Sequence, residues 1–260
     1  MTLPSEFLPV FVHNALGDAA ELLPAVRAGK VPWRKMLEFC EHLRIAGIGS
    51  LFLEGTSEGL VRRLSQSGRA FGHFLAGAPE AAKRTSQCAP FFDAVAADDL
   101  EGAAQVARHA RREWAQGVEY EEDFLFVELL MQHFFLEAHP AWCQALLARY
   151  EQALQGAEDV RWGLCKALLE VDGTTFDDAL DLYLSERDDR LKRQVKKELM
   201  PPEAAATVGQ LCVEGMALVR LAERKGMPTR EDYLHVPSIA REPFPRVVRA
   251  DSWLHLDEED

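Results

Sequence analysis

The residues with the most evident chemical potential form one acidic stretch, Glu119-Tyr-Glu-Glu-Asp-Phe-Leu-Phe126. Its carboxylates and its tyrosine stand immediately before an apolar run that extends from Phe124 to Leu136. Carboxylates in the first turn of a helix are favoured by the helix dipole, so helix initiation and a solvated surface explain part of the cluster. The cluster also raises the local negative potential, which suits contact with a basic protein partner.

The partner-binding hypothesis predicts that the glutamates of the stretch project into solvent while Tyr120, Phe124 and Phe126 dock it on the body. Alternatively, Tyr120 and Phe126 supply an aromatic anchor for the partner. Asp123 is either an inward hydrogen-bond acceptor or part of the same anionic edge. A second acidic pair precedes the stretch in sequence and would form an adjacent acidic edge. The predicted binding residues are therefore Glu119, Tyr120, Glu121, Glu122, Asp123, Asp98 and Asp99.

The nearest approach to a metal-ligand group comprises Glu128, His133, Glu137 and His139. His133 and Glu137 share a helical face, but the two histidines are spaced so that they point in different directions. A helical His–Glu pair followed by a histidine near a helix C-terminus explains the same residues without a metal. Glu128 stands among apolar residues; if it is buried it should pair with an arginine, because a lone buried carboxylate is costly.

Motifs of enzymes and cofactor sites are weak in this sequence. The glycine-containing segments Gly47–Ser50 and Gly55–Gly59 lack the lysine and the spacing of a phosphate-binding loop. No Gly-x-Ser-x-Gly motif occurs. The aromatic residues between Phe91 and Tyr150 fall among aliphatic ones at helical spacing, which favours core packing over a cofactor box. We therefore expect no catalytic residue, no cofactor and no metal.

Composition limits the class of partner. The formal net charge of −13 over 260 residues would repel nucleic acid and anionic membranes, so neither is expected to bind directly. The five cysteines are scattered without a Cys-x-x-Cys pair, which argues against a disulfide framework or a zinc site. The sequence has no basic leader and no run of about 18 apolar residues. These features favour a cytoplasmic protein whose partner is another protein.

The secondary-structure elements that must position these residues are predicted to be almost entirely helical. Apolar residues recur at the helical spacing, whereas alternating β-branched runs are scarce. The helices that the sequence predicts cover approximately Gly17–Ala28, Trp33–Ala46, Ser57–Phe74, Pro79–Ala97, Leu100–Ala110, Phe124–Leu136, Pro140–Tyr150, Asp159–Val171, Thr174–Lys197 and Pro202–Arg224.

Short turns between these helices predict an all-α fold, either a multi-helix bundle or an irregular array of antiparallel helical hairpins. We expect residues 1–236 to form a single all-helical domain. Prolines after Pro228 predict an irregular, acidic C-terminal tail over residues 237–260, packed on the body and ending in the solvated acids Asp257–Asp260.

With its flanking helices, the segment Tyr120-Glu-Glu-Asp-Phe-Leu-Phe126 resembles the central signature of the immunity protein 49 family, Tyr-Glu-Asp-Asp-Phe-Leu-Tyr. Most positions agree; Glu122 replaces an acid by an acid, and Phe126 replaces an aromatic residue by another. In helix order and length the resemblance extends over about residues 91–224. It implies an all-α antitoxin that binds a cognate toxin of a bacterial polymorphic toxin system, with a secreted nuclease effector as one candidate toxin.

Two alternatives remain open at this stage. A scaffold or adaptor could use the groove of a tetratricopeptide-like helical array, although no repeat of fixed period is present. A metalloprotein built around Glu128, His133 and His139 would carry stoichiometric metal after purification. The sequence does not define the oligomeric state.

Overall fold

The computed structural model describes residues 5–243 and 248–256, and within these residues all regular elements are helices. The β-type pairing in these residues is limited to a single isolated bridge between Tyr233 and Val236. The predicted all-α class is therefore confirmed. The α-helices are α1 (Leu8–Arg27), α2 (Trp33–Glu54), α3 (Glu58–Gly77), α4 (Ala89–Ala96), α5 (Leu100–His109), α6 (Glu121–Phe135), α7 (Pro140–Leu154), α8 (Val160–Glu170), α9 (Gly173–Lys196), α10 (Pro202–Ala206) and α11 (Val213–Arg224).

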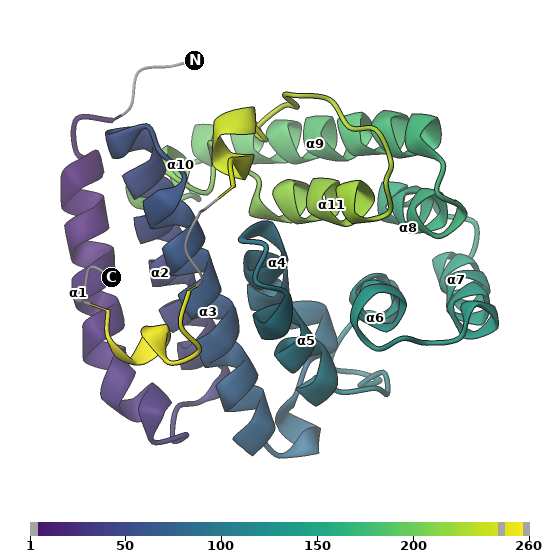
Figure 1. Cartoon of the computed structure of the whole chain (residues 1–260), viewed down its shortest axis with the longest axis horizontal. Helices are drawn as coiled ribbons and strands as arrows, with labels where there is room; N and C mark the ends of the chain where they lie inside the picture. The colour runs from purple at the N-terminus through teal and green to yellow at the C-terminus, as the bar shows by residue number, and fades with distance from the viewer. Residues whose placement is uncertain (1–4, 244–247, 257–260) are drawn as a thin grey trace.

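The helices form successive antiparallel hairpins around a continuous core (Figure 1). Helices α1, α2 and α3 pack together at one side, α4 and α5 lie in the middle, and α6, α7 and α8 occupy the opposite side. Helices α9 and α11 run beside each other along one edge, and α11 also packs on α4. Large side chains from all these regions are fully buried; they include Phe39, Phe71, Phe91, Phe124, Tyr150 and Phe176.

Several helix boundaries differ from the predicted ones. Helix α1 begins at Leu8, well before the predicted Gly17, because Pro9 stands in its first turn, where its missing N–H is not needed. Helix α2 continues to Glu54 through Gly47 and Gly49. The predicted helix over 79–97 is wrong: two 3₁₀ turns, Glu80–Ala82 and Thr85–Gln87, precede the short α4.

The predicted long helix from Pro202 to Arg224 is also wrong, because its middle is held in another conformation by distant residues. The Arg187 guanidinium donates to the carbonyls of Val208 and Leu211. The backbone N–H of Cys212 donates to the His235 carbonyl at 2.8 Å. Through these hydrogen bonds the backbone groups between α10 and α11 find partners, although the segment is not helical.

The C-terminal residues contact α3. Trp253 is buried, and its ring lies 5.0 Å from the His73 ring, centroid to centroid. Gln66 Nε2 donates to the Ser252 carbonyl at 2.9 Å, and Arg63 Nη1 donates to the Leu256 carbonyl at 2.8 Å. The acidic end, Asp257–Asp260, lies outside the described residues.

Candidate partner-binding surface

The acidic stretch surrounds the start of α6. Glu121, Glu122 and Asp123 occupy the first turn of this helix, where their charges complement the exposed N–H groups and the helix dipole. Tyr120 precedes them as the N-cap residue in an extended conformation, and its side chain makes no capping hydrogen bond. Helix initiation therefore accounts for the position of the three acids.

Glu119 points inward, so the prediction that it projects into solvent is wrong. Its side chain is buried, and its carboxylate accepts hydrogen bonds from the backbone N–H of Ala115 at 3.1 Å and of Ser86 at 3.0 Å. The Glu119 carbonyl accepts from Trp114 Nε1 at 2.8 Å. These bonds fold the loop between α5 and α6 onto the 3₁₀ turn at Thr85–Gln87, and they offset the desolvation of the carboxylate.

Tyr120 lies on the surface, contrary to the prediction that it docks the segment. It is 73% exposed, the largest exposure among the large hydrophobic residues that the structure describes. Val118, two residues earlier, is also exposed. The docking is instead performed by Phe124 and Phe126, which are buried; the Phe126 ring stacks on Phe92 at 5.8 Å.

Glu121 and Asp123 connect α6 to its neighbours. Glu121 forms an ion pair with Arg149 of α7 at 2.6 Å. Asp123 accepts from Arg161 of α8 at 2.7 Å, as the inward alternative predicted. Both carboxylates keep a partly exposed edge. By contrast, the side chain of Glu122 makes no hydrogen bond or ion pair with the residues that the structure describes.

Arg161 is the centre of this ion-pair network. Its guanidinium also binds Asp159, the N-cap of α8, at 2.7 Å. Asp159 in turn accepts from the Tyr150 hydroxyl at 2.8 Å. Burial raises the pKa of Asp159, but the hydrogen bonds and the charge of Arg161 outweigh burial, so the net pKa lies below its ordinary value. The network fixes the first turn of α6 against α8. Arg161 was not predicted, because its distance from the stretch in sequence hides the contact.

Asp98 and Asp99 also differ from each other, because only one of them has internal partners. Asp99 caps α5 by accepting from the Gly102 N–H at 3.0 Å. It also binds Arg69 of α3 through two hydrogen bonds of 2.6 and 2.8 Å and is almost fully buried. Asp98 is exposed in the left-handed backbone region, with a φ of 56°. Asp98 is thus the member of the pair that a partner could contact.

Two of the four residues considered as metal ligands, Glu128 and His139, have structural partners. Glu128 is buried and pairs with Arg112 at 3.2 Å and with Gln132 at 2.7 Å, which confirms the predicted arginine pairing. Burial raises the pKa of the Glu128 carboxyl. His139 caps α7 by accepting from the Ala141 N–H at 3.2 Å. Among the described residues, no group of three or more His, Cys, Asp or Glu side chains could hold a metal ion.

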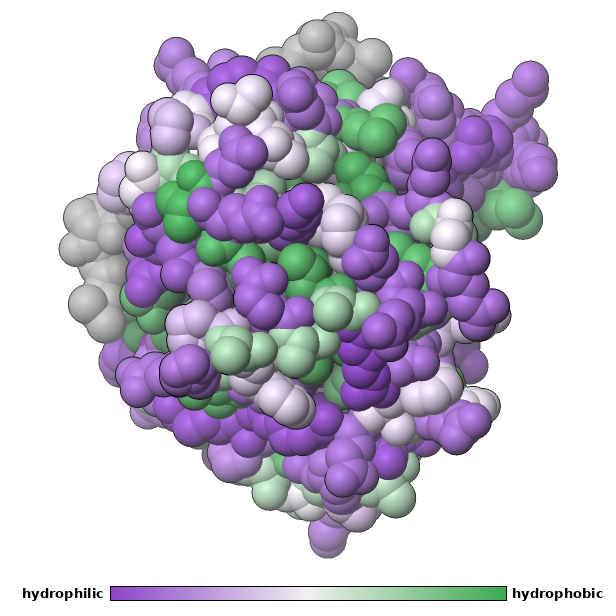
Figure 2. Space-filling view, turned by 90° about the vertical axis from the view of Figure 1, so that its right-hand side faces the viewer, coloured by the Kyte–Doolittle hydropathy of each residue, from purple (hydrophilic) through white to green (hydrophobic). Residues whose placement is uncertain are grey.

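The face formed by α6, α7 and α8 is mostly hydrophilic. Figure 2 shows this side of the molecule, with hydrophobic residues in several small areas between hydrophilic ones. Trp142 on α7 and Val171 after α8 are among the exposed large hydrophobic residues of these elements. In the part of the chain that the structure describes, no helix has the length and hydropathy needed to cross a membrane.

The fold and the surface thus define an all-α protein whose acidic stretch combines internal ion pairs with a few exposed side chains. The family model described as immunity protein 49 matches residues 39–239. Because this match covers most of the sequence, the chain belongs to the immunity protein 49 family. No curated protein and no solved structure gives a significant match.

Proposed function

We propose that the protein binds and neutralises a cognate toxin of a bacterial polymorphic toxin system. The family match over residues 39–239 carries this proposal, since membership of an immunity protein family implies binding to a cognate toxin. The same membership favours neutralisation of a toxin over the adaptor function that a helical array would also allow. The protein acts by stoichiometric binding and performs no catalysis.

The surface around the start of α6 is our candidate for part of the toxin contact. Tyr120 offers an exposed aromatic side chain of the kind that often anchors protein interfaces. Glu122 provides a carboxylate with no internal partner among the described residues, and Glu121 and Asp123 add charge from their partly exposed edges. Asp98 is a further candidate on the exposed turn between α4 and α5. The internal bonds of Glu119 and Asp99 favour a role in holding this surface in place.

A nuclease is the toxin class that this charge fits best. An enzyme that cleaves nucleic acid needs a basic cleft for the phosphate backbone. A protein with a net charge of −13 would be attracted to such a cleft, which accelerates association and keeps nucleic acid out. We therefore propose a secreted nuclease effector as the toxin, neutralised in the cytoplasm of the producing cell.

Coexpression with a candidate toxin from a neighbouring gene tests the proposal. We expect rescue of growth and copurification of the two chains as a complex. The variant Tyr120→Ala combined with Glu122→Lys should weaken the complex about 100-fold or more, if the two side chains lie near the centre of the interface. Titration calorimetry with the separately purified immunity protein and toxin measures the change, and circular dichroism verifies that the helices remain.

A matched control carries the same kinds of change on another exposed surface, Leu182→Ala combined with Asp178→Lys on α9. This variant should retain the affinity of the wild type. Rescue of growth without copurification would contradict neutralisation by binding. Equal affinity of the two double variants would remove the start of α6 from the toxin contact.

A further inference from the structure

The C-terminal half of α9 carries an apolar stripe that the body does not cover. In the first half of this helix, Phe176, Leu180 and Leu184 are buried against the neighbouring helices. Helical spacing places Leu191 and Val195 on the same face, about two and three turns beyond Leu184. Val195 is 51% exposed, and Leu199 just after the helix is 70% exposed. The apolar face of α9 therefore extends past the hydrophobic core, and its C-terminal part is exposed to solvent.

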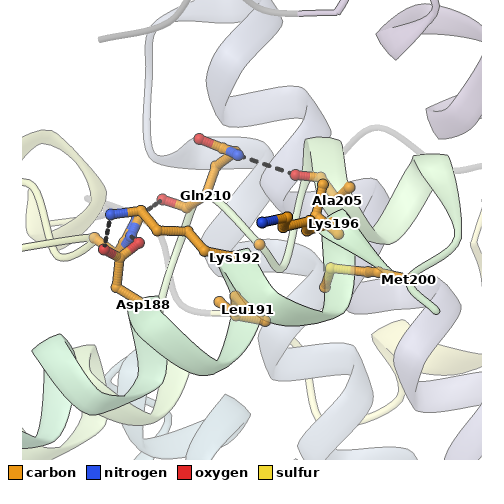
Figure 3. A pocket seen from close by; sticks show the side chains of 10 residues that line it. Asp188, Leu191, Lys192, Lys196, Met200, Ala205 and Gln210 are labelled. Carbon is orange, nitrogen blue, oxygen red and sulfur yellow. Dashed lines mark hydrogen bonds and ion pairs between the residues drawn. The ribbon is translucent and has the colours of Figure 1, made fainter. Parts of the chain in front are cut away.

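This uncovered face forms one wall of a groove of about 430 Å³. The opposite wall comes from α10 and the segment that follows it, with Ala205, Gly209 and Gln210. Figure 3 shows the α9 residues of the groove with Ala205 and Gln210 across from them. Gln210 Nε2 donates to the Ala205 carbonyl at 3.0 Å, and His235 Nδ1 lies 3.0 Å from the Gln210 carbonyl oxygen. These bonds hold the second wall in place.

The rim of the groove is basic, although the protein as a whole is acidic. Two lysines, Lys192 and Lys196, line the groove together with one acid, Asp188. Lys192 and Lys196 stand one turn apart on the groove side of α9 (Figure 3). Lys192 binds Asp188 at 2.5 Å and is 71% exposed, whereas Lys196 is exposed without a partner among the described residues.

An apolar floor with a cationic rim matches a definite kind of ligand. A helix that places apolar residues one turn apart on the floor would bury Val195, and acidic residues beside them would meet Lys192 and Lys196. Nucleic acid would leave the apolar stripe uncovered and would be repelled by the net charge of −13. A second copy of this chain carries the same net charge, which disfavours self-association.

We propose that this groove binds an acidic amphipathic helix of the cognate toxin. The inference rests on the proposed function for the identity of the partner, but it uses a surface separate from the start of α6. The complex then has two contacts of opposite sign, one acidic and one basic on the immunity protein. Such an arrangement fixes the orientation of the partner more strictly than one charged surface does.

The test begins with a labelled helical peptide of about four turns, designed with leucines along one face and glutamates beside them. Fluorescence anisotropy should show saturable binding with a Kd on the order of 10–100 µM. Val195→Asp and Lys196→Glu should each weaken binding about tenfold or more. The matched controls Leu182→Asp and Arg193→Glu change exposed residues on the opposite side of α9 and should bind as the wild type does.

The second step measures the same four variants in the complex with the toxin. Val195→Asp and Lys196→Glu should raise the Kd for the toxin about tenfold or more, while both controls leave it unchanged. If the wild type binds the toxin and all four variants bind equally well, the groove inference fails while the proposed function stands. If the wild type does not bind the toxin, the proposed function itself fails.

Three further outcomes would overturn the groove inference. One is the absence of saturable peptide binding at millimolar concentration. Another is equal binding of a peptide in which lysines replace the glutamates. The third is a dimer in sedimentation experiments that Val195→Asp converts to monomers, because a second copy would then occupy the groove.

Discussion

At the scale of single residues, the acidic stretch contains carboxylates with different functions. The Glu119 carboxylate holds two backbone N–H groups, whereas the Glu122 side chain is free of such bonds to the described residues. A residue of the first kind stabilises the fold, and one of the second kind has no such internal role. Two glutamates only three positions apart in the sequence thus have different physical roles.

Glu119→Ala should lower the free energy of unfolding by about 2–4 kcal/mol, because the N–H groups of Ala115 and Ser86 lose their acceptor in a buried place. Glu122→Ala, a matched change three residues later, should alter it by less than about 0.5 kcal/mol. Urea denaturation followed by circular dichroism measures both values. Equal losses in the two variants would refute the structural role assigned to Glu119.

His133 should make the protein less stable in mild acid. Burial, with a further contribution from the charge of Lys225, lowers the pKa of His133 from 6.5 to about 4, and its Nε2 has no hydrogen-bond partner. At a pH between these two pKa values, the unfolded chain binds the proton more readily than the folded chain does. The contribution of His133 to stability is therefore present above pH 6.5 and is lost as the pH falls toward 4.

The variant His133→Gln should reduce the loss of stability between pH 7 and pH 4.5 by roughly 1 kcal/mol, a value discounted because the residue is partly exposed. The control His13→Gln changes an exposed histidine of α1 and should leave the loss as in the wild type. Urea denaturation at both pH values provides the comparison. An unchanged loss in His133→Gln would mean that other groups cause the acid sensitivity.

At the scale of elements, α3 and α4 approach so closely that only glycine fits between them. A Cβ at Gly68 would lie 2.6 Å from Ala94 Cβ and 3.2 Å from the Pro90 carbonyl oxygen. Gly68→Ala should therefore lower the free energy of unfolding by about 1–3 kcal/mol, since one helix must move.

The control Gly77→Ala changes a glycine at the end of the same helix with open space around it. It should change stability by less than about 1 kcal/mol and in the stabilising direction. Thermal denaturation of the two variants distinguishes these outcomes; a loss at Gly77 equal to that at Gly68 would contradict the close-contact explanation.

The elements that could be predicted from the sequence are those with local signals. Asp99 and Asp159 stand where caps are expected, and both accept the expected backbone hydrogen bonds. The wrong predictions fall where distant groups decide the backbone. Arg187 and His235 hold the segment between α10 and α11, and nothing within that segment indicates it.

The candidate surface shows the same limit. The pairing of Glu128 with an arginine could be predicted because burial of a carboxylate demands it. The inward turn of Glu119 could not be predicted, because its acceptor role depends on Ser86, which is 33 residues away in the sequence. The groove on α9 was not predicted either. Its second wall is formed by α10 and the segment after it, which the sequence predicted to be part of one long helix.

At the scale of the whole molecule, contacts from both ends of the sequence meet in one core. The cluster extends from Ala19 to Leu256 and includes residues of both the predicted domain and the predicted tail. Trp253, Ser252 and Leu256 contact α3, nearly two hundred residues earlier. We infer that the C-terminal residues unfold together with the helical body.

Trp253→Ala should therefore reduce the stability of the entire protein. The change empties a buried site beside His73 and should lower the global free energy of unfolding by about 3–5 kcal/mol. Leu234→Ala, which alters an exposed apolar residue near the same end, should cost less than about 1 kcal/mol. Denaturation followed in parallel by circular dichroism and by the fluorescence of the other tryptophans tests the coupling, because a cooperative unit gives coincident transitions. If the body of Trp253→Ala unfolds at the wild-type urea concentration, the tail is an independent attachment, and the division at residue 236 that the sequence suggested describes a true boundary of stability.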